Sequence, residues 1–165
     1  MKKLLLCAMT VFFALALGCG GERTAEVTGS QIVYGSKNYD RINPLRDEYG
    51  EIDRLLFDGL VRRNDAGEVV PALASSWEYD ADTYTYVFHL RDDVRWHDGK
   101  PLRAADVKFT IEAIQNPLTD SANVSNFEDV REITELDDRT VRIRLSAPNA
   151  AFLTYMIQPI LPAHL

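Results

Sequence analysis

The segment from Thr83 to Arg91, TYTYVFHLR, alternates between two sets of side chains and constrains the fold more than any other part of the chain. Successive side chains of a β-strand point to opposite faces, so this pattern predicts a strand with one buried and one solvated face. A single strand cannot cover its own buried face, and neighbouring strands are therefore expected. The face expected to be buried carries Tyr84, Tyr86, Phe88 and Leu90.

Turn residues identify the neighbours of this strand. Asp80 to Asp82 predicts a turn that pairs it with a strand at 76–79. A short strand is predicted at 94–96, ending at the Asp98-Gly99 turn. A second hairpin is predicted from 130–136 and 140–145. Trp77 and Trp96 are expected to join the aromatic residues in the core.

Helical spacing appears in three other places. Val107, Ile111 and Ile114 lie one turn apart and predict a helix over 104–115, followed by a polar loop over 116–129. A helix is also predicted to begin near Glu51 and to use Leu60 on its apolar face, and a last one over 150–158. With a first strand at 31–36, the chain is predicted to be α+β.

Residues 1–18 are interpreted as an export signal and not as part of the fold. Lys2 and Lys3 precede an uncharged apolar run from Leu4 to Leu17, which is short for a membrane span but typical of a signal peptide. Ala16-Leu17-Gly18-Cys19 resembles a bacterial lipobox, which implies lipid attachment at Cys19. The alternative is an ordinary secretory signal cut near Gly18. Residues 19–29 read as a flexible tether.

The formal net charge of the 165 residues is -7, and basic residues are scattered among acidic ones. Nucleic-acid binding needs clustered Lys and Arg, so no nucleic-acid partner is expected. Of the two cysteines, Cys7 lies inside the export signal, so the mature chain is expected to form no disulfide. The three histidines lack a metal-ligand spacing, and no nucleophile motif is present. We therefore expect no metal site, no cofactor and no enzymatic activity.

A long series of ordered motifs resembles the family 5 extracellular solute-binding proteins. These motifs are PALASSWE at 71–78, FHLR at 88–91, VRWHDGKPL at 94–102, ADVKFT at 105–110, DRTVRIRL at 138–145 and PILPAHL at 159–165. Arg103 stands where the family usually has Thr or Ser as a helix N-cap, and a weaker cap is expected there.

The resemblance implies the N-terminal segment of a two-lobed periplasmic-binding-protein fold of type II. Residues 30–165 would form the start of lobe I and its β-rich subdomain. Family members are several times longer, so we expect a truncated product or a partial sequence. The implied function is to capture di- or oligopeptides outside the cytoplasmic membrane, as a monomer, and to deliver them to the permease of an ABC importer. The implied location is the periplasm or cell surface, with the lipid at Cys19 as membrane anchor.

Two loops carry the candidate ligand-binding residues. Amide and aromatic side chains suit peptide ligands, because they offer hydrogen bonds and flat apolar contacts. The resemblance places both loops near the cleft, although ordinary solvated loops remain the alternative. The candidates are Asn38, Tyr39, Asn43, Tyr49, Asn126 and Phe127.

Other functions are left open by the sequence. Nickel or another solute is the alternative cargo within the same family. A chain complete at 165 residues would instead be a lipid-anchored interaction module without a cleft.

Overall fold

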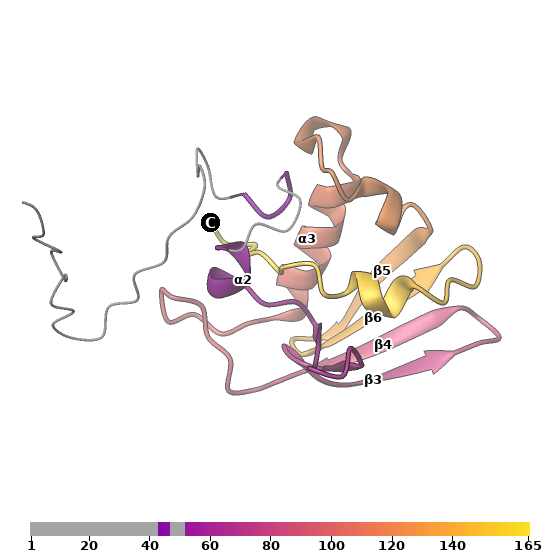
Figure 1. The fold of residues 1–165 in the computed structure, drawn as a ribbon, viewed down its shortest axis with the longest axis horizontal. Coiled ribbons are helices and arrows are strands. Elements are labelled where there is room, and N and C mark those ends of the chain that lie inside the picture. The colour runs from indigo at the N-terminus through magenta and orange to yellow at the C-terminus, as the bar shows by residue number, and fades with distance from the viewer. Residues whose placement is uncertain (1–42, 47–51) are drawn as a thin grey trace, which may run out of the picture. The chain divides into compact units, whose positions relative to one another are not determined.

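The computed structural model describes residues 43–46 and 52–165, and the larger of their two sheets is four-stranded and antiparallel (Figure 1). Its strand order is β3-β4-β6-β5. The strands are β3 (Ala74–Asp80), β4 (Thr85–Leu90), β5 (Val130–Asp137) and β6 (Thr140–Leu145). In this register Phe88 pairs with Trp77 on one side and with Val141 on the other.

The predicted alternation in β4 is confirmed. Tyr86, Phe88 and Leu90 are buried, and the residues between them are half-buried. Helix α3 (Ala104–Gln115) has the predicted bounds and buries Val107, Ile111 and Ile114. These side chains join those of β4 and β6 in one hydrophobic core, so the α+β expectation is confirmed.

Three local predictions are wrong. The helix expected near Glu51 is only four residues long, α2 (Asp53–Leu56), and leaves Leu55 60% exposed. Leu60 is buried beyond its end, because the chain turns extended after Phe57. Residues 94–96 form no strand, only a bridge from Arg95 to Pro101 around the Asp98-Gly99 turn.

The third error concerns the end of the chain. The last helix, α4 (Phe152–Tyr155), covers less than half of the predicted range, and Gln158 lies in the extended stretch that follows it. The predicted loop at 116–129 contains two 3-10 turns, η1 (Pro117–Thr119) and η2 (Val124–Phe127). The sequence did not predict the short hairpin of β1 (Val61–Arg63) and β2 (Val69–Pro71). It forms a separate two-stranded sheet and directly precedes β3 in the chain.

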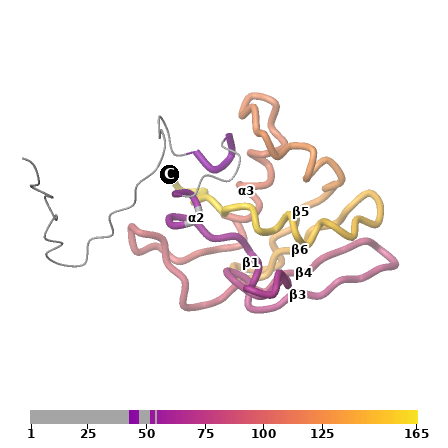
Figure 2. The backbone as a smooth tube through the Cα atoms, viewed as in Figure 1, coloured from indigo at the N-terminus to yellow at the C-terminus, as the bar shows by residue number. Residues whose placement is uncertain are grey.

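One buried carboxylate attaches the last residues of the chain to α3. Asp106 is 4% exposed and accepts three hydrogen bonds. Its Oδ2 accepts from Trp96 Nε1 at 3.1 Å and from Arg103 N at 2.9 Å, and its Oδ1 accepts from Ala163 N at 2.9 Å. Leu161 N also donates to Thr110 Oγ1 of α3, so the segment after α4 lies against the helix (Figure 2).

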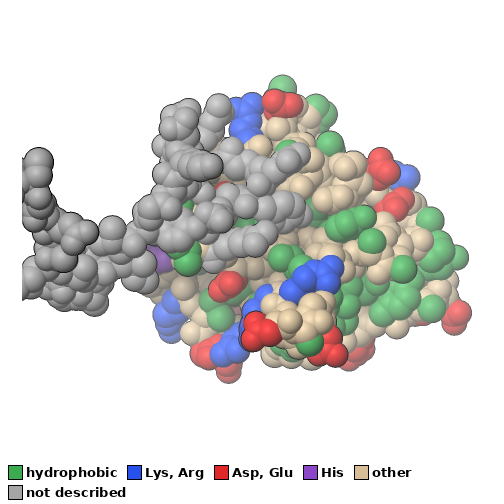
Figure 3. Space-filling view, in the orientation of Figure 1, with side chains coloured by type: hydrophobic (Ala, Val, Ile, Leu, Met, Phe, Trp, Pro, Cys, Tyr) green, Lys and Arg blue, Asp and Glu red, His purple; other side chains and the backbone are tan. Residues whose placement is uncertain are grey.

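The face of the sheet that points away from the hydrophobic core is polar. Glu132 lies between Arg142 and Arg144, with its oxygens 3.5 Å and 3.1 Å from their nitrogens. Elsewhere too, basic side chains lie among acidic ones on the face drawn in Figure 3. Within the described ranges, no helix has the length and apolar character that a membrane crossing requires.

Candidate functional site

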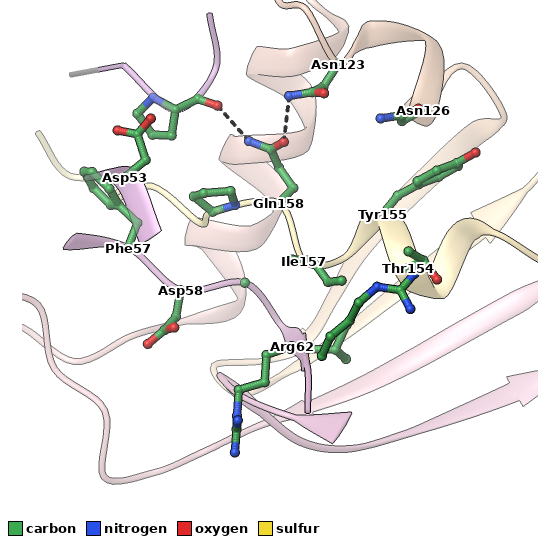
Figure 4. Close-up of a pocket in the computed structure, with 15 residues that line it drawn as sticks. Asp53, Phe57, Asp58, Arg62, Asn123, Asn126, Thr154, Tyr155, Ile157 and Gln158 are labelled. Carbon is green, nitrogen blue, oxygen red and sulfur yellow. Dashed lines mark hydrogen bonds between the residues drawn. The ribbon is translucent and has the colours of Figure 1, made fainter. Parts of the chain in front are cut away.

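An open cavity of about 530 Å³ is formed by four segments that are distant in the sequence. Pro44 comes from the turn at 43–46, and residues 53–63 form one wall. Asn123 and Asn126 come from the loop after α3, and residues 154–159 form the remaining wall (Figure 4). The cavity therefore depends on tertiary packing and not on any single motif.

Gly59 allows two of these walls to meet. A Cβ atom at this position would lie 2.5 Å from the carbonyl oxygen of Ile157, closer than side chains approach backbone atoms. The close crossing is held by hydrogen bonds from Val61 N to Met156 O and from Ile160 N to Asp58 O, at 3.3 Å and 2.9 Å. Only glycine fits here because the neighbour is backbone and cannot rotate away.

Two buried amide side chains join three of the segments. Gln158 is 3% exposed, and its Nε2 donates to the carbonyl oxygen of Pro44 at 2.9 Å. Its Oε1 accepts from Nδ2 of Asn123 at 3.0 Å (Figure 4). Asn123 is 5% exposed. Buried polar groups with good partners fix their surroundings, so these bonds hold the cavity wall in place.

The predicted residue Asn43 shapes the turn next to this wall. Its Oδ1 accepts from Leu45 N at 3.1 Å, which is an Asx turn. Ser121 Oγ donates to Leu45 O at 2.7 Å and so attaches the turn to the loop after α3. Asn43 itself is absent from the cavity lining, and its neighbour Pro44 takes that place.

The structure separates the other candidates. Asn126 is half-buried and lines the cavity. Phe127 is 1% exposed and packs edge-on against Phe152 with ring centroids 6.3 Å apart, so its side chain serves the core. Cys19, Asn38, Tyr39 and Tyr49 lie outside the described residues.

Gln158 was missed by the sequence analysis. It stood at the end of a predicted helix, where an amide is unremarkable, and its two partners lie 35 and 114 residues away. Asn123 belongs to the loop that was singled out, but spacing alone did not separate it from its neighbours. The only local signal was a polar residue directly before Pro159 in an otherwise apolar stretch.

Charges of both signs stand around the cavity. Asp53 is buried and Asp58 is exposed on one wall, and Arg62 and Arg63 follow on β1. Arg63 NH1 donates to Gly67 O at 2.7 Å. Among the residues described, no three His, Cys, Asp or Glu side chains gather in a way that would hold a metal ion. Amides, aromatic rings and mixed charges suit a polar solute that carries both donors and acceptors.

The family assignment comes from comparison with known proteins. The sequence profile described as bacterial extracellular solute-binding proteins, family 5 Middle, matches residues 68–164, more than half of the chain. The chain belongs to this family. The resemblance seen in the sequence motifs is thus confirmed, and the family is defined by solute binding and not by catalysis.

Individual relatives of this solute-binding family are similar over part of their length. Protein XP55 of Streptomyces lividans is 33% identical over 146 residues, covering 88% of this chain and 26% of the relative. The dipeptide-binding protein of Escherichia coli K12 is 38% identical over 103 residues, covering 52% of this chain and 19% of the relative. This chain therefore spans about a quarter of the length of such relatives or less.

Solved structures agree with the fold. The crystal structure of NikZ from Campylobacter jejuni in complex with Ni(L-His) matches with a TM-score of 0.72 and 40% identity. The match covers 78% of this chain and 26% of NikZ. The described fold thus corresponds to part of a periplasmic solute-binding protein.

Proposed function

We propose that this chain supplies part of the solute-binding site of an ABC importer and that its cargo is a di- or oligopeptide. The observation that most supports this proposal is a cavity lined by Asn123, Asn126 and Gln158 in a chain of the solute-binding family. Amide side chains match the N–H and C=O groups of a peptide backbone. In this proposal the protein captures the solute outside the cytoplasmic membrane and hands it to the permease, without a chemical step.

Relatives support the peptide cargo and also name its main competitor. The dipeptide-binding protein of Escherichia coli supports a peptide. NikZ, with 40% identity, was solved with Ni(L-His), which supports a nickel chelate as the second candidate. A chelate brings its own ligand atoms, so it needs fewer metal-binding side chains from the protein than a bare ion does.

Calorimetric titration of the protein expressed from its native gene distinguishes the two. We expect saturable heat with di- and tripeptides, with dissociation constants in the micromolar range or tighter. Heat with Ni²⁺ and L-histidine but with no peptide would overturn the peptide assignment. A sugar titrated under the same conditions serves as the unrelated control.

The proposal includes a lipid anchor at Cys19, and it is supported by the export-signal pattern of residues 1–19 alone. Several acyl chains on one cysteine bind a membrane stably, whereas one chain binds it only marginally. Cys19→Ser is expected to move the exported protein from the membrane fraction to the soluble fraction and to abolish incorporation of labelled palmitate. Unchanged membrane association of that variant would favour an ordinary secretory signal.

A further inference from the structure

The surroundings of the buried amides Asn123 and Gln158 determine which end of each side chain is the donor NH₂ group and which is the acceptor oxygen. We call this arrangement the polarity of the amide. An amide side chain can usually be turned over, which exchanges its donor and its acceptor. The carbonyl oxygen of Pro44 can only accept, so the end of Gln158 that faces it, 2.9 Å away, must be the NH₂ group. Oε1 of Gln158 then faces Asn123, which must in turn present its own NH₂ group at 3.0 Å.

This sequence of bonds leaves one acceptor for the cavity. Oδ1 of Asn123 points away from Gln158 in Figure 4 and accepts no hydrogen bond from any residue that the structure describes. Turning Asn123 over would set its oxygen against Oε1 of Gln158, and turning both would set Oε1 against the Pro44 carbonyl. Two acceptors in contact at a buried site are strongly unfavourable, so Oδ1 stays where it is.

Asn126 provides the contrast. It lines the same cavity, and its side-chain amide makes no hydrogen bond within the described ranges. It can therefore turn over to suit a donor or an acceptor on the solute. The wall thus combines one amide of fixed polarity with one that adapts.

We infer that Pro44, Gln158 and Asn123 act as a polarity relay, which makes the cavity select solutes that place an N–H donor against Asn123 Oδ1. The inference rests on the proposed function and narrows it to a chemical class. A peptide N–H or a protonated amine satisfies this acceptor. A carboxylate, ester or ether oxygen at the same place leaves it unpaired or repels it, which is the kind of mismatch that polar sites discriminate against most strongly.

The relay itself is tested without any ligand. Asn123→Asp replaces the donor that faces Gln158 by an oxygen, and Gln158→Glu replaces the donor that faces Pro44. Each is expected to lower the thermal midpoint of the full chain by about 4 °C or more. Asn126→Asp makes the same chemical change on the unfixed amide and should lower it by less than about 1 °C. Equal shifts for Asn123→Asp and Asn126→Asp would overturn the relay.

The selection is tested on the protein from its native gene with trialanine and three analogues. Two analogues replace one amide N–H by an ester oxygen, and the third lacks the amino group. At least one should bind about tenfold more weakly than trialanine to the wild type, and this difference should disappear in Asn123→Leu. Differences that are the same in both proteins would overturn the inference even though peptides bind. If the wild type binds no peptide, the peptide cargo fails, and the stability comparison alone decides the relay.

Discussion

Replacing Asp106 by Asn should weaken the fold far more than a change of one oxygen atom suggests. Both oxygens of Asp106 accept, and all three partners are donors: Trp96 Nε1, Arg103 N and Ala163 N, at 3.1, 2.9 and 2.9 Å. Asparagine has only one acceptor oxygen. Its NH₂ group must therefore face a donor, and the cheaper orientation turns it toward Ala163.

The magnitude follows from these contacts. That orientation loses one hydrogen bond to a charged acceptor and sets the new NH₂ group against the N–H of Ala163 in a part-buried contact. It also makes the two remaining bonds neutral. A charge-assisted bond contributes about 1.5–3 kcal/mol, and a buried unsatisfied donor costs about 1–3 kcal/mol. Release of the buried charge offsets part of this loss. We expect the free energy of unfolding to fall by about 2–4 kcal/mol, which lowers the thermal midpoint by roughly 4–16 °C.

Chemical denaturation followed by tryptophan fluorescence measures this loss, because Trp96 is itself a partner of Asp106. Asp138→Asn is the matched control, since Asp138 is mostly exposed and pairs with Arg103 NH1 at 2.7 Å on the surface. The control should change the free energy of unfolding by no more than about 0.5 kcal/mol. Equal losses for the two variants would refute the role assigned to Asp106.

Two further predictions concern a steric clash and pH. Gly59→Ala places a Cβ 2.5 Å from Ile157 O and should lower the free energy of unfolding by about 1–3 kcal/mol. An unchanged midpoint in thermal denaturation would contradict the close crossing. The N–H of Lys100, followed by the ring of His164, lowers the pKa of the Asp98 carboxyl. Such a group stabilises the fold above its unfolded pKa, so the midpoint should fall as pH drops below about 4, and a rise on acidification would contradict this.

The parts of the fold that sequence predicted correctly are those in which one period holds over several residues. Helix α3 has three buried apolar residues one turn apart, and β4 alternates without a break. Their burial patterns follow directly from local geometry. A weaker helix cap was expected at Arg103, because its side chain cannot accept a hydrogen bond as Ser or Thr does. The helix start is nevertheless held by a different bond, in which Arg103 N donates to Oδ2 of Asp106.

The errors arose where tertiary contacts overrule the local pattern. Leu56 and Leu60 lie four residues apart, as on one face of a helix, but the chain leaves the helix after Leu56 so that Gly59 can cross the backbone of Ile157. The short hairpin of β1 and β2 has only three residues in each strand, too few for a visible alternation.

The site was harder to predict than the fold for the same reason. Asn126 was selected because polar loops often carry binding residues, and the structure places it in the cavity lining. Gln158 was not, because its role depends on Pro44, which lies 114 residues earlier. Phe127 was selected as an aromatic loop residue, yet the 3-10 turn η2 directs it into the core against Phe152.

The most direct test of the proposed function is a calorimetric titration of the protein expressed from its native gene. Trialanine and the complex of Ni²⁺ with L-histidine would be titrated in parallel experiments. The cavity built by Asn123, Asn126 and Gln158 predicts saturable binding of the peptide in the micromolar range or tighter. Binding of the nickel complex together with no heat from trialanine or any other di- or tripeptide would contradict the assignment of a peptide cargo.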